Sequence, residues 1–310
     1  MPHILCRLRC AALLAILTLP GVCPADPTTE QVSVLAWRQE RFSSLTSDDG
    51  WLTLAGLYWL EDGDNSFGSD PGNSLVLANP AVPGSVGTFS VSGGRVSFTA
   101  ESGAGVMLDG QPVDSMNPVK LVSDAGSQPS VLACGPLRFF IIERGGKLGL
   151  RVRDLNSPRR LEFRGLEYFP VSSRWAINAR FVPYQPARHI KIINILGMEV
   201  DEISPGAVAF SRNGRQWRLD TVLEDPGDRT LFIMFADTTN GTESYGAGRF
   251  LTIPMPVGNS ALVDFNEAYN PPCAFNDFAT CPLPPPQNRL QLRVDAGELK
   301  YAGGPQHAAQ

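Results

Sequence analysis

The sequence predicts a mainly β protein, in which an N-terminal helix is followed by two packed β-rich halves. First, 30 Gly and 26 Pro are spread through the 310 residues between short apolar runs, as turns between strands would be. Second, many of these runs alternate apolar and polar residues with the period of a strand. Third, the segment 26–46 combines apolar residues at helical spacing with a charged face.

The first 25 residues predict a signal peptide for export. Two arginines precede a short apolar run at 11–19, and the small residue Ala25 marks the expected cleavage point. A lipoprotein signal at Cys23 is a minor alternative, because the residue before it is bulkier than such a signal needs. The apolar run is shorter than the roughly 20 residues that span a bilayer, and no later segment comes near that length. We therefore expect a soluble periplasmic or secreted protein with no transmembrane segment in the mature chain.

The composition limits the partners of the mature chain. Removing residues 1–25 takes away two of the 26 basic residues and none of the 31 acidic residues, which changes the net charge from −5 to −7. A mildly acidic protein is not expected to bind nucleic acid, because nucleic-acid binders carry a basic face. Of the basic residues, 22 are Arg and four are Lys, so guanidinium groups that could bind anions are plentiful.

The first half, residues 26–155, is expected to contain the helix and a sandwich of short strands. The helix is expected to dock on the sheet that follows it, which begins with an apolar strand at 51–60. The layout from Gly68-Ser69 to Asp109-Gly110 resembles a forkhead-associated domain in shape. The residues with which that domain reads phosphothreonine are not matched, so the resemblance implies the shape alone.

Two hairpins have clear turn signals. The first joins strands at 137–143 and 147–154, and the second joins 207–212 to 215–223 through Asn213-Gly214. Asn-Gly favours the left-handed backbone that a two-residue hairpin turn requires.

The second half, residues 156–301, is expected to be β-rich and to end in a flexible tail at 302–310. Separate strands are predicted at 179–184 and 190–196. The run 230–236 has no polar face, so it is expected to be a central strand that is covered on both sides.

Polar residues gather where this central strand ends. If the run pairs with the strand that begins near Arg249, then Asp237 and Arg249 lie at the base of a hairpin. One interpretation is a structural ion pair that closes the turn. The other is that Arg249 presents its fork to a ligand carboxylate or phosphate, with Tyr245 as a wall.

Asp264, Asn266 and Asn270 follow another apolar strand. They are either turn formers that bond their own backbone, or ligand contacts, or a weak oxygen-rich cation site. Their spacing matches no calcium loop, and we predict no metal site here.

Cys273 and Cys281 flank a Pro-rich loop, and in an exported protein this spacing predicts a disulfide. Zinc is the alternative, but the ordered mature chain offers one histidine, His189, and one further cysteine, Cys134. We therefore predict no metal and no cofactor.

Three function classes remain, and the preferred one is the binding of a small anionic or polar ligand in a pocket built from residues 237–298. Arg151 and Arg153 share one face of their strand, which is either a solvated edge or part of an anion pocket between the two halves. The candidate ligand contacts are Arg249, Arg151, Tyr245, Asp237, Asp264, Asn266, Asn270 and Trp175.

One alternative is a hydrolase whose acid and base are carboxylates, with Asp237, Asp264 and Glu298 as candidates. The other is an envelope protein that binds or supports another protein through an exposed apolar patch.

Several motifs together resemble a bacterial family of unknown function, domain-of-unknown-function family 1684. They include Gly50-Trp51-Leu52, Arg151-Val152-Arg153-Asp154, Phe163-Arg164-Gly165, Tyr168-Phe169-Pro170, Asp237-Thr238-Thr239, Gly248-Arg249-Phe250-Leu251, Asp264-Phe265-Asn266, Asn270-Pro271-Pro272-Cys273 and Ala296-Gly297-Glu298. The resemblance covers nearly all of the mature chain. It implies a one-piece β-rich protein without implying a reaction, and it singles out Asp237, Tyr245, Arg249, Asp264, Asn266, Asn270 and the two cysteines.

Overall fold

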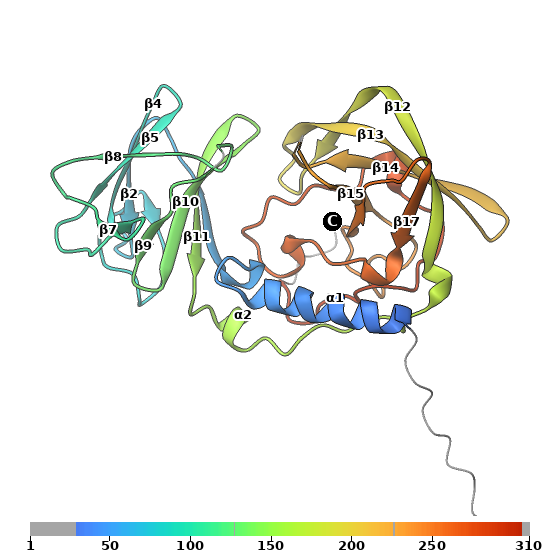
Figure 1. Cartoon of the computed structure of the whole chain (residues 1–310). Coiled ribbons are helices and arrows are strands. Elements are labelled where there is room, and N and C mark those ends of the chain that lie inside the picture. The colour runs from blue at the N-terminus through green and yellow to red at the C-terminus, as the bar shows by residue number, and fades with distance from the viewer. Residues whose placement is uncertain (1–28, 127, 226, 306–310) are drawn as a thin grey trace, which may run out of the picture.

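The computed structural model describes residues 29–126, 128–225 and 227–305. The expected signal peptide and residues 306–310 of the expected tail lie outside these ranges. The described chain is mainly β, with one N-terminal helix and two lobes that lie side by side (Figure 1). Within the described ranges, no helix is both long and apolar enough to cross a membrane.

The first lobe is a sandwich of two sheets. One sheet has the strand order β1, β11, β10, β9, β6 and β7, with bounds Leu54–Trp59, Lys147–Asp154, Leu137–Arg144, Leu132–Cys134, Met107–Leu108 and Gln111–Pro112. The other has the order β3, β2, β4, β5 and β8, with bounds Leu75–Val76, Gly63–Gly68, Gly87–Ser92, Arg95–Ala100 and Val119–Leu121. Phenylalanines from both sheets fill the space between them; Phe89 and Phe139, for example, meet edge to face with ring centroids 6.2 Å apart.

The predicted hairpin of β10 and β11 is confirmed. Its turn residues Gly145 and Gly146 have φ of +55° and +73°, a left-handed conformation that Gly adopts without strain. Strand alternation points Leu150 and Val152 into the sandwich, whereas Arg151 faces away from it.

The second lobe is built on one six-stranded antiparallel sheet. Its strand order is β16, β15, β14, β13, β12 and β17, with bounds Arg249–Pro254, Thr230–Phe235, Arg215–Leu223, Glu199–Arg212, Ala176–Ile193 and Ser260–Asp264. The sheet curls until Cα atoms of its edge strands, β16 and β17, come within 8 Å of each other. The enclosed core includes Trp175, Phe210, Phe235 and Phe265.

Two predictions for this sheet are confirmed and one is wrong. The Asn213-Gly214 hairpin joins β13 to β14 with φ of +52° and +71° at the two turn residues. The run 230–236 forms β15, an interior strand of the sheet whose residues Leu231 to Phe235 are all buried. The strands predicted at 179–184 and 190–196 are one strand, β12, whose pairing with β13 is irregular between Pro183 and Arg188. Pro has no backbone N–H to donate, so it interrupts the ladder without ending the strand.

The predicted helix is confirmed as α1 (Thr29–Thr46), but the expectation that it docks on the following sheet is wrong. It runs beneath the second lobe (Figure 1), where Trp37 lies 6.3 Å from Tyr269 and Phe42 stacks on Phe163 at 5.4 Å between ring centroids. The aromatic partners of the helix thus lie beyond the first lobe in the sequence, at positions 163 and 269. The remaining short helices are η1 (Trp51–Thr53), α2 (Pro158–Leu161), η2 (Ser173–Trp175), η3 (Phe265–Glu267), η4 (Pro272–Ala274) and η5 (Pro286–Asn288).

Candidate functional site

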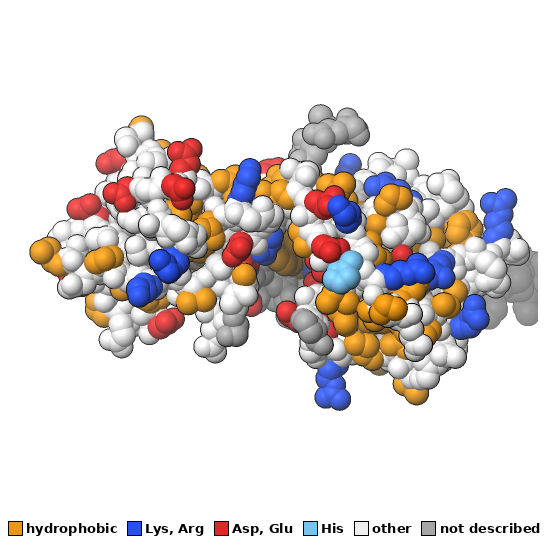
Figure 2. Space-filling view, turned by 90° about the horizontal axis from the view of Figure 1, so that it is seen from above, with side chains coloured by type: hydrophobic (Ala, Val, Ile, Leu, Met, Phe, Trp, Pro, Cys, Tyr) orange, Lys and Arg blue, Asp and Glu red, His pale blue; other side chains and the backbone are white. Residues whose placement is uncertain are grey.

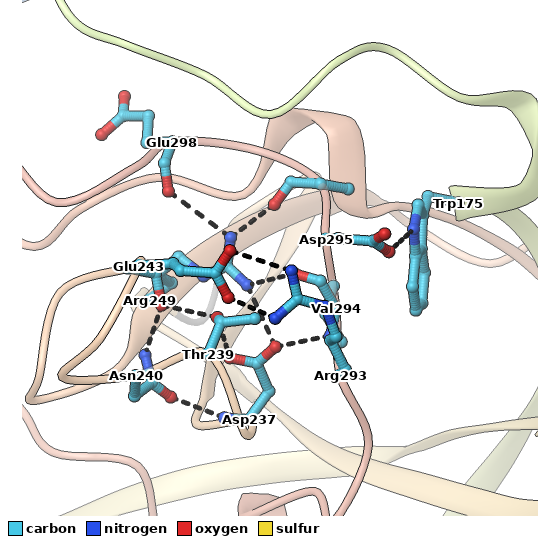
Figure 3. A network of polar contacts seen from close by, with 12 residues as sticks. Trp175, Asp237, Thr239, Asn240, Glu243, Arg249, Arg293, Val294, Asp295 and Glu298 are labelled. Atoms are coloured by element: carbon cyan, nitrogen blue, oxygen red, sulfur yellow. Dashed lines mark hydrogen bonds and ion pairs between the residues drawn. The ribbon is translucent and has the colours of Figure 1, made fainter.

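Asp237 and Arg249 meet at the base of the β15–β16 hairpin, as the sequence predicts. β15 ends opposite the start of β16, and Arg249 Nη2 lies 3.3 Å from Asp237 Oδ2, with both side chains fully buried (Figure 3). The Thr239 hydroxyl donates to the other carboxylate oxygen of Asp237 at 2.7 Å. The ion pair is therefore part of a closed polar network.

The guanidinium of Arg249 is occupied by the protein itself. Nη2 also donates to Val294 O at 2.9 Å, and Nη1 donates to Ala296 O. In return, Val294 N donates to Asp237 Oδ2 at 2.7 Å, so the pair clamps the C-terminal segment against the hairpin. This geometry agrees with the structural interpretation of the pair and not with a fork that is open to a ligand. Burial lowers the pKa of Arg249, and the Asp237 carboxylate opposes this effect.

Asp264, Asn266 and Asn270 also bond to the chain. Asp264 Oδ1 accepts from Asn266 N at 2.9 Å and so caps η3. The Asn266 amide exchanges two hydrogen bonds of 3.0 Å with the backbone of Ser172, and Asn270 Nδ2 donates to Leu299 O at 2.8 Å. Only the Asp264 contact is the local bond of a turn former, whereas Asn266 and Asn270 tie distant segments of the chain together.

Glu298 anchors helix α1 to the second lobe. Its side chain is fully buried, and it accepts from Arg41 Nε at 2.9 Å and from Asn270 N at 2.7 Å. Burial raises the pKa of Glu298, and Arg41 opposes this. Arg41 was not predicted from the sequence, because a charged residue on a helix usually faces water. Since Asp237 and Glu298 hold the fold together, no observation favours the hydrolase alternative.

Trp175 and Tyr245 have structural partners as well. Trp175 Nε1 donates to Asp295 Oδ1 at 2.8 Å, and its ring packs on Phe265 in the second core. Tyr245 donates through its hydroxyl to Cys273 O at 3.1 Å. The structure does not bring either side chain together with Arg151.

Arg151 differs from these residues. It is 5% exposed, and both of its hydrogen bonds come from Nη2, to Thr280 Oγ1 at 3.3 Å and to Phe278 O at 3.5 Å. Both distances are long for N–H···O bonds, and Nε has no partner. Among the described residues no ion pair within 4.0 Å includes Arg151, and Asp124 is paired with Arg144 at 2.7 Å. Burial and then the charge of Arg144 lower the pKa of Arg151 to about 10.

Arg151 lies where the two lobes meet. The strand register places Phe140 and Leu57 beside it on the outer face of the first lobe, opposite Phe278 and Thr280 of the second lobe. Seen from above, the molecular surface is furrowed between the lobes (Figure 2). The interpretation of this strand face as a solvated edge is wrong, because the loop of the second lobe covers it. Sequence reasoning missed Phe278 and Thr280, which carry no signal apart from their place between two cysteines.

Cys273 and Cys281 are adjacent, buried free thiols in the structure, which therefore does not show the predicted disulfide. Cys273 N donates to Cys281 Sγ at 3.0 Å. Hydrogen bonding from the Cys281 thiol lowers the pKa of Cys273, and burial raises the pKa of Cys281 well above its ordinary value. Cys134 is buried separately, in the core of the first lobe. Across the described part of the chain, no cluster of three His, Cys, Asp or Glu residues is arranged to hold a metal ion.

A family model and 16 chains of solved structures match this chain. The model described as "Protein of unknown function (DUF1684)" matches residues 161–299, most of the second lobe. No curated protein matches.

Among the solved structures, an uncharacterized protein of Haloarcula marismortui is 30% identical, with 45% of this chain and 78% of that chain covered and a TM-score of 0.39. The FHA domain of a Chlamydia trachomatis protein is 18% identical over 32% of this chain and 93% of its own, with a TM-score of 0.22. The FHA domain of an Arabidopsis thaliana protein is 15% identical over 33% of this chain and 86% of its own, again with a TM-score of 0.22. On the match of its second lobe and on the motifs quoted above, the chain belongs to the DUF1684 family of proteins of unknown function.

Proposed function

We propose that this protein binds a small anion in the cleft between its lobes, with Arg151 as the anchor. The observation that carries the proposal is a buried guanidinium with an unpartnered Nε and no ion pair within 4.0 Å in the described chain. A buried charge that lacks an ion-pair partner is unfavourable, so a bound anion would stabilise the protein. A carboxylate or phosphate would supply the missing charge and accept two parallel N–H bonds.

This proposal keeps the ligand class that the sequence predicts and changes the anchor. Arg249 donates to backbone carbonyls and to Asp237, so its fork is closed. Arg151 has donor capacity left, and the Thr280 hydroxyl beside it offers a second polar contact. Phe140 and Leu57 add an apolar wall on the same strand face, which favours anions with an apolar body over inorganic ions.

The test is a thermal-shift and calorimetric screen of the protein against phosphate, sulfate, benzoate and citrate. A ligand at about 100 times its Kd should raise the free energy of unfolding by about 2.7 kcal/mol. Arg151→Met should abolish this stabilisation. It should also raise the Tm of the ligand-free protein, because it removes a buried charge that has no carboxylate partner.

Arg95→Met is the matched control, since Arg95 lies exposed at a turn of the first lobe. Arg95→Met should change neither the stabilisation by the anion nor the Tm of the ligand-free protein. The proposal fails if no anion stabilises the protein, or if the Arg151 variant binds as well as the unaltered protein does. A lower Tm for ligand-free Arg151→Met would show instead that Arg151 has a structural role.

We propose further that the protein is exported, that residues 1–25 are removed, and that Cys273 and Cys281 are then joined. The support is their adjacency in a buried loop, with Cys273 N at 3.0 Å from Cys281 Sγ. Oxidation would remove two electrons and two protons from the two thiols, which a disulfide-donating oxidoreductase of the export compartment would accept. Peptide mapping without reduction, on protein recovered from the periplasm, should find the 273–281 crosslink and a mature chain that begins at Asp26. Cys134 should stay a free thiol, and a reduced 273–281 pair would refute this proposal.

A further inference from the structure

A separate hollow lies between helix α1 and residues 163–168. Its volume is about 280 Å³, and its lining includes Leu35, Arg38, Gln39 and Phe42 on the helix side. Phe163 and Tyr168 line the opposite side, and both belong to motifs that carry the family resemblance. Neither the buried network nor the Arg151 cleft uses these residues.

The lining of the hollow contains one cation, Arg38. The Arg38 guanidinium lies 4.1 Å from the centroid of the Tyr168 ring, and Nη2 donates to Phe169 O at 3.1 Å. Nε has no hydrogen-bond partner. None of the residues that line the hollow is acidic. No ion pair of the described residues includes Arg38, and the carboxylate of Glu298 is paired with Arg41 instead. Burial lowers the pKa of Arg38, and Tyr168 and Glu298 oppose this.

Apolar side chains flank Arg38 on both sides along the helix. Phe42 stacks on Phe163 at 5.4 Å between ring centroids, yet 38% of Phe42 stays exposed. Leu35, two turns earlier on the same helix face, is 53% exposed. With a rise of 1.5 Å per residue, the helix face from Leu35 to Phe42 is about 10 Å long.

From this combination of one cation and flanking apolar side chains, we propose that the hollow binds a small amphipathic monocarboxylate. Arg38 would bind the carboxylate through its free donor capacity, and Leu35, Phe42 and Phe163 would cover a short apolar chain or a single ring. The volume of about 280 Å³ lies just below the range of roughly 300–1,000 Å³ that is typical of ligand pockets, which argues against a long-chain lipid. This site is independent of the Arg151 cleft and of the function proposed for it.

Isothermal titration with octanoate tests the proposal, with octan-1-ol as the probe that lacks the charge. Octanoate should bind more tightly than the alcohol, because only the carboxylate can pair with Arg38. Arg38→Met should weaken octanoate binding by about tenfold or more, the effect of losing one charge-assisted hydrogen bond, and Arg38→Lys should restore part of it. Arg151→Met should leave octanoate binding unchanged, which separates this site from the cleft between the lobes.

Gln39→Trp provides a second test that leaves Arg38 in place. Gln39 is exposed and lines the hollow, so a Trp side chain there should fill the hollow and abolish binding without lowering the Tm. Ala36→Trp, at an exposed position of the same helix outside the hollow, is the matched control and should bind octanoate normally. The proposal is wrong if octanoate does not bind, or if it binds Gln39→Trp as well as Ala36→Trp. It is also wrong if the protein ignores free octanoate but sediments with phosphatidylglycerol vesicles, because the hollow would then face a lipid surface.

Discussion

At the scale of single residues, Arg249 and Arg151 are both buried but differ in their partners. Arg249 pairs with Asp237 and donates from Nη1 and Nη2 to carbonyl groups, so its charge is neutralised and both Nη atoms are occupied, and only Nε is left without a partner. Arg151 meets one hydroxyl and one carbonyl at long distances and pairs with no carboxylate within 4.0 Å in the described chain. Arginine therefore stabilises the fold at one position, and at the other it is the residue that we propose to bind an anion.

Removing Arg249 should destabilise the protein strongly. In Arg249→Met the buried Asp237 carboxylate keeps only its bonds from Thr239 and Val294, and a broken buried pair typically costs about 3–5 kcal/mol. Urea unfolding should show this loss, whereas Arg95→Met at an exposed turn should change stability by less than about 0.5 kcal/mol. The double variant Asp237→Asn, Arg249→Met should lose less than the sum of the two single losses. Additive losses would contradict a coupled pair.

Glu267 should make stability depend on pH. Burial, then the charges of Asp264 and Glu40, raise its pKa to about 7, compared with about 4.3 in an unfolded chain. Between these values the folded state holds the extra proton, so the free energy of unfolding falls as the pH rises from about 4 to 7.

Glu267→Gln removes this titration. The variant should therefore match the unaltered protein near pH 4 and have a Tm higher by about 2 °C or more at pH 8. Scanning calorimetry across this range measures the difference. Glu61→Gln, at an exposed position, should give no such divergence. A Glu267→Gln variant that is less stable at pH 8 would show that the carboxylate is stabilising.

At the scale of elements, residues 294–298 cross the second lobe and bind to both the β15–β16 hairpin and helix α1. We call this segment the C-terminal strap. Val294, Ala296 and Glu298 supply its contacts to Arg249 and Arg41, and Gly297 lets the backbone turn between them. Gly297 has φ of +80°, and a Cβ there would lie 2.4 Å from Ala268 O. Both the conformation and the close approach require Gly at this position.

Gly297→Ala should therefore be far more harmful than the same change at Gly103, which also has φ of +80° but has no atom within 4 Å of its Cβ position. Gly103→Ala should lose about 1–2 kcal/mol, the usual penalty of a left-handed Ala. Gly297→Ala should lose that amount and a further penalty, because a backbone carbonyl must move. Urea unfolding of both variants gives the comparison, and equal losses would show that the strap is loosely packed.

At the scale of the whole molecule, the chain crosses between its lobes twice. Helix α1 packs on the second lobe, residues 54–154 form the first lobe, and the chain then returns through α2. The second lobe therefore depends on a segment from the other end of the sequence. Without Arg41, the buried Glu298 would keep one hydrogen bond and no ion pair.

This topology predicts how fragments behave. Residues 54–155 contain a complete sandwich core and should fold alone, with a cooperative melting transition. Residues 161–305 alone should be unstable, and a peptide of residues 29–53 added in trans should restore their folding. Circular dichroism melting and NMR shift dispersion measure both effects. A fragment 161–305 that melts cooperatively without the peptide would show that α1 is dispensable.

The sequence alone determined the features that depend on neighbouring residues. The turns at Gly145-Gly146 and Asn213-Gly214, the buried strand β15 and the helix α1 all follow from local backbone preference and periodicity. The mainly β class and the family follow from the same patterns and from short motifs. The Asp237–Arg249 contact could be predicted because the two residues lie at the two ends of one hairpin.

Only the tertiary structure decided what the polar residues do. Val294 and Ala296, whose carbonyl groups bind Arg249, lie 45 and 47 positions away, and the partners of Arg151 lie 127 and 129 positions away. Whether a buried guanidinium has N–H donors left for a ligand depends on which distant carbonyl and carboxylate groups already bond to it. No local pattern records that arrangement, because it results from how the two lobes, the helix and the C-terminal strap pack together.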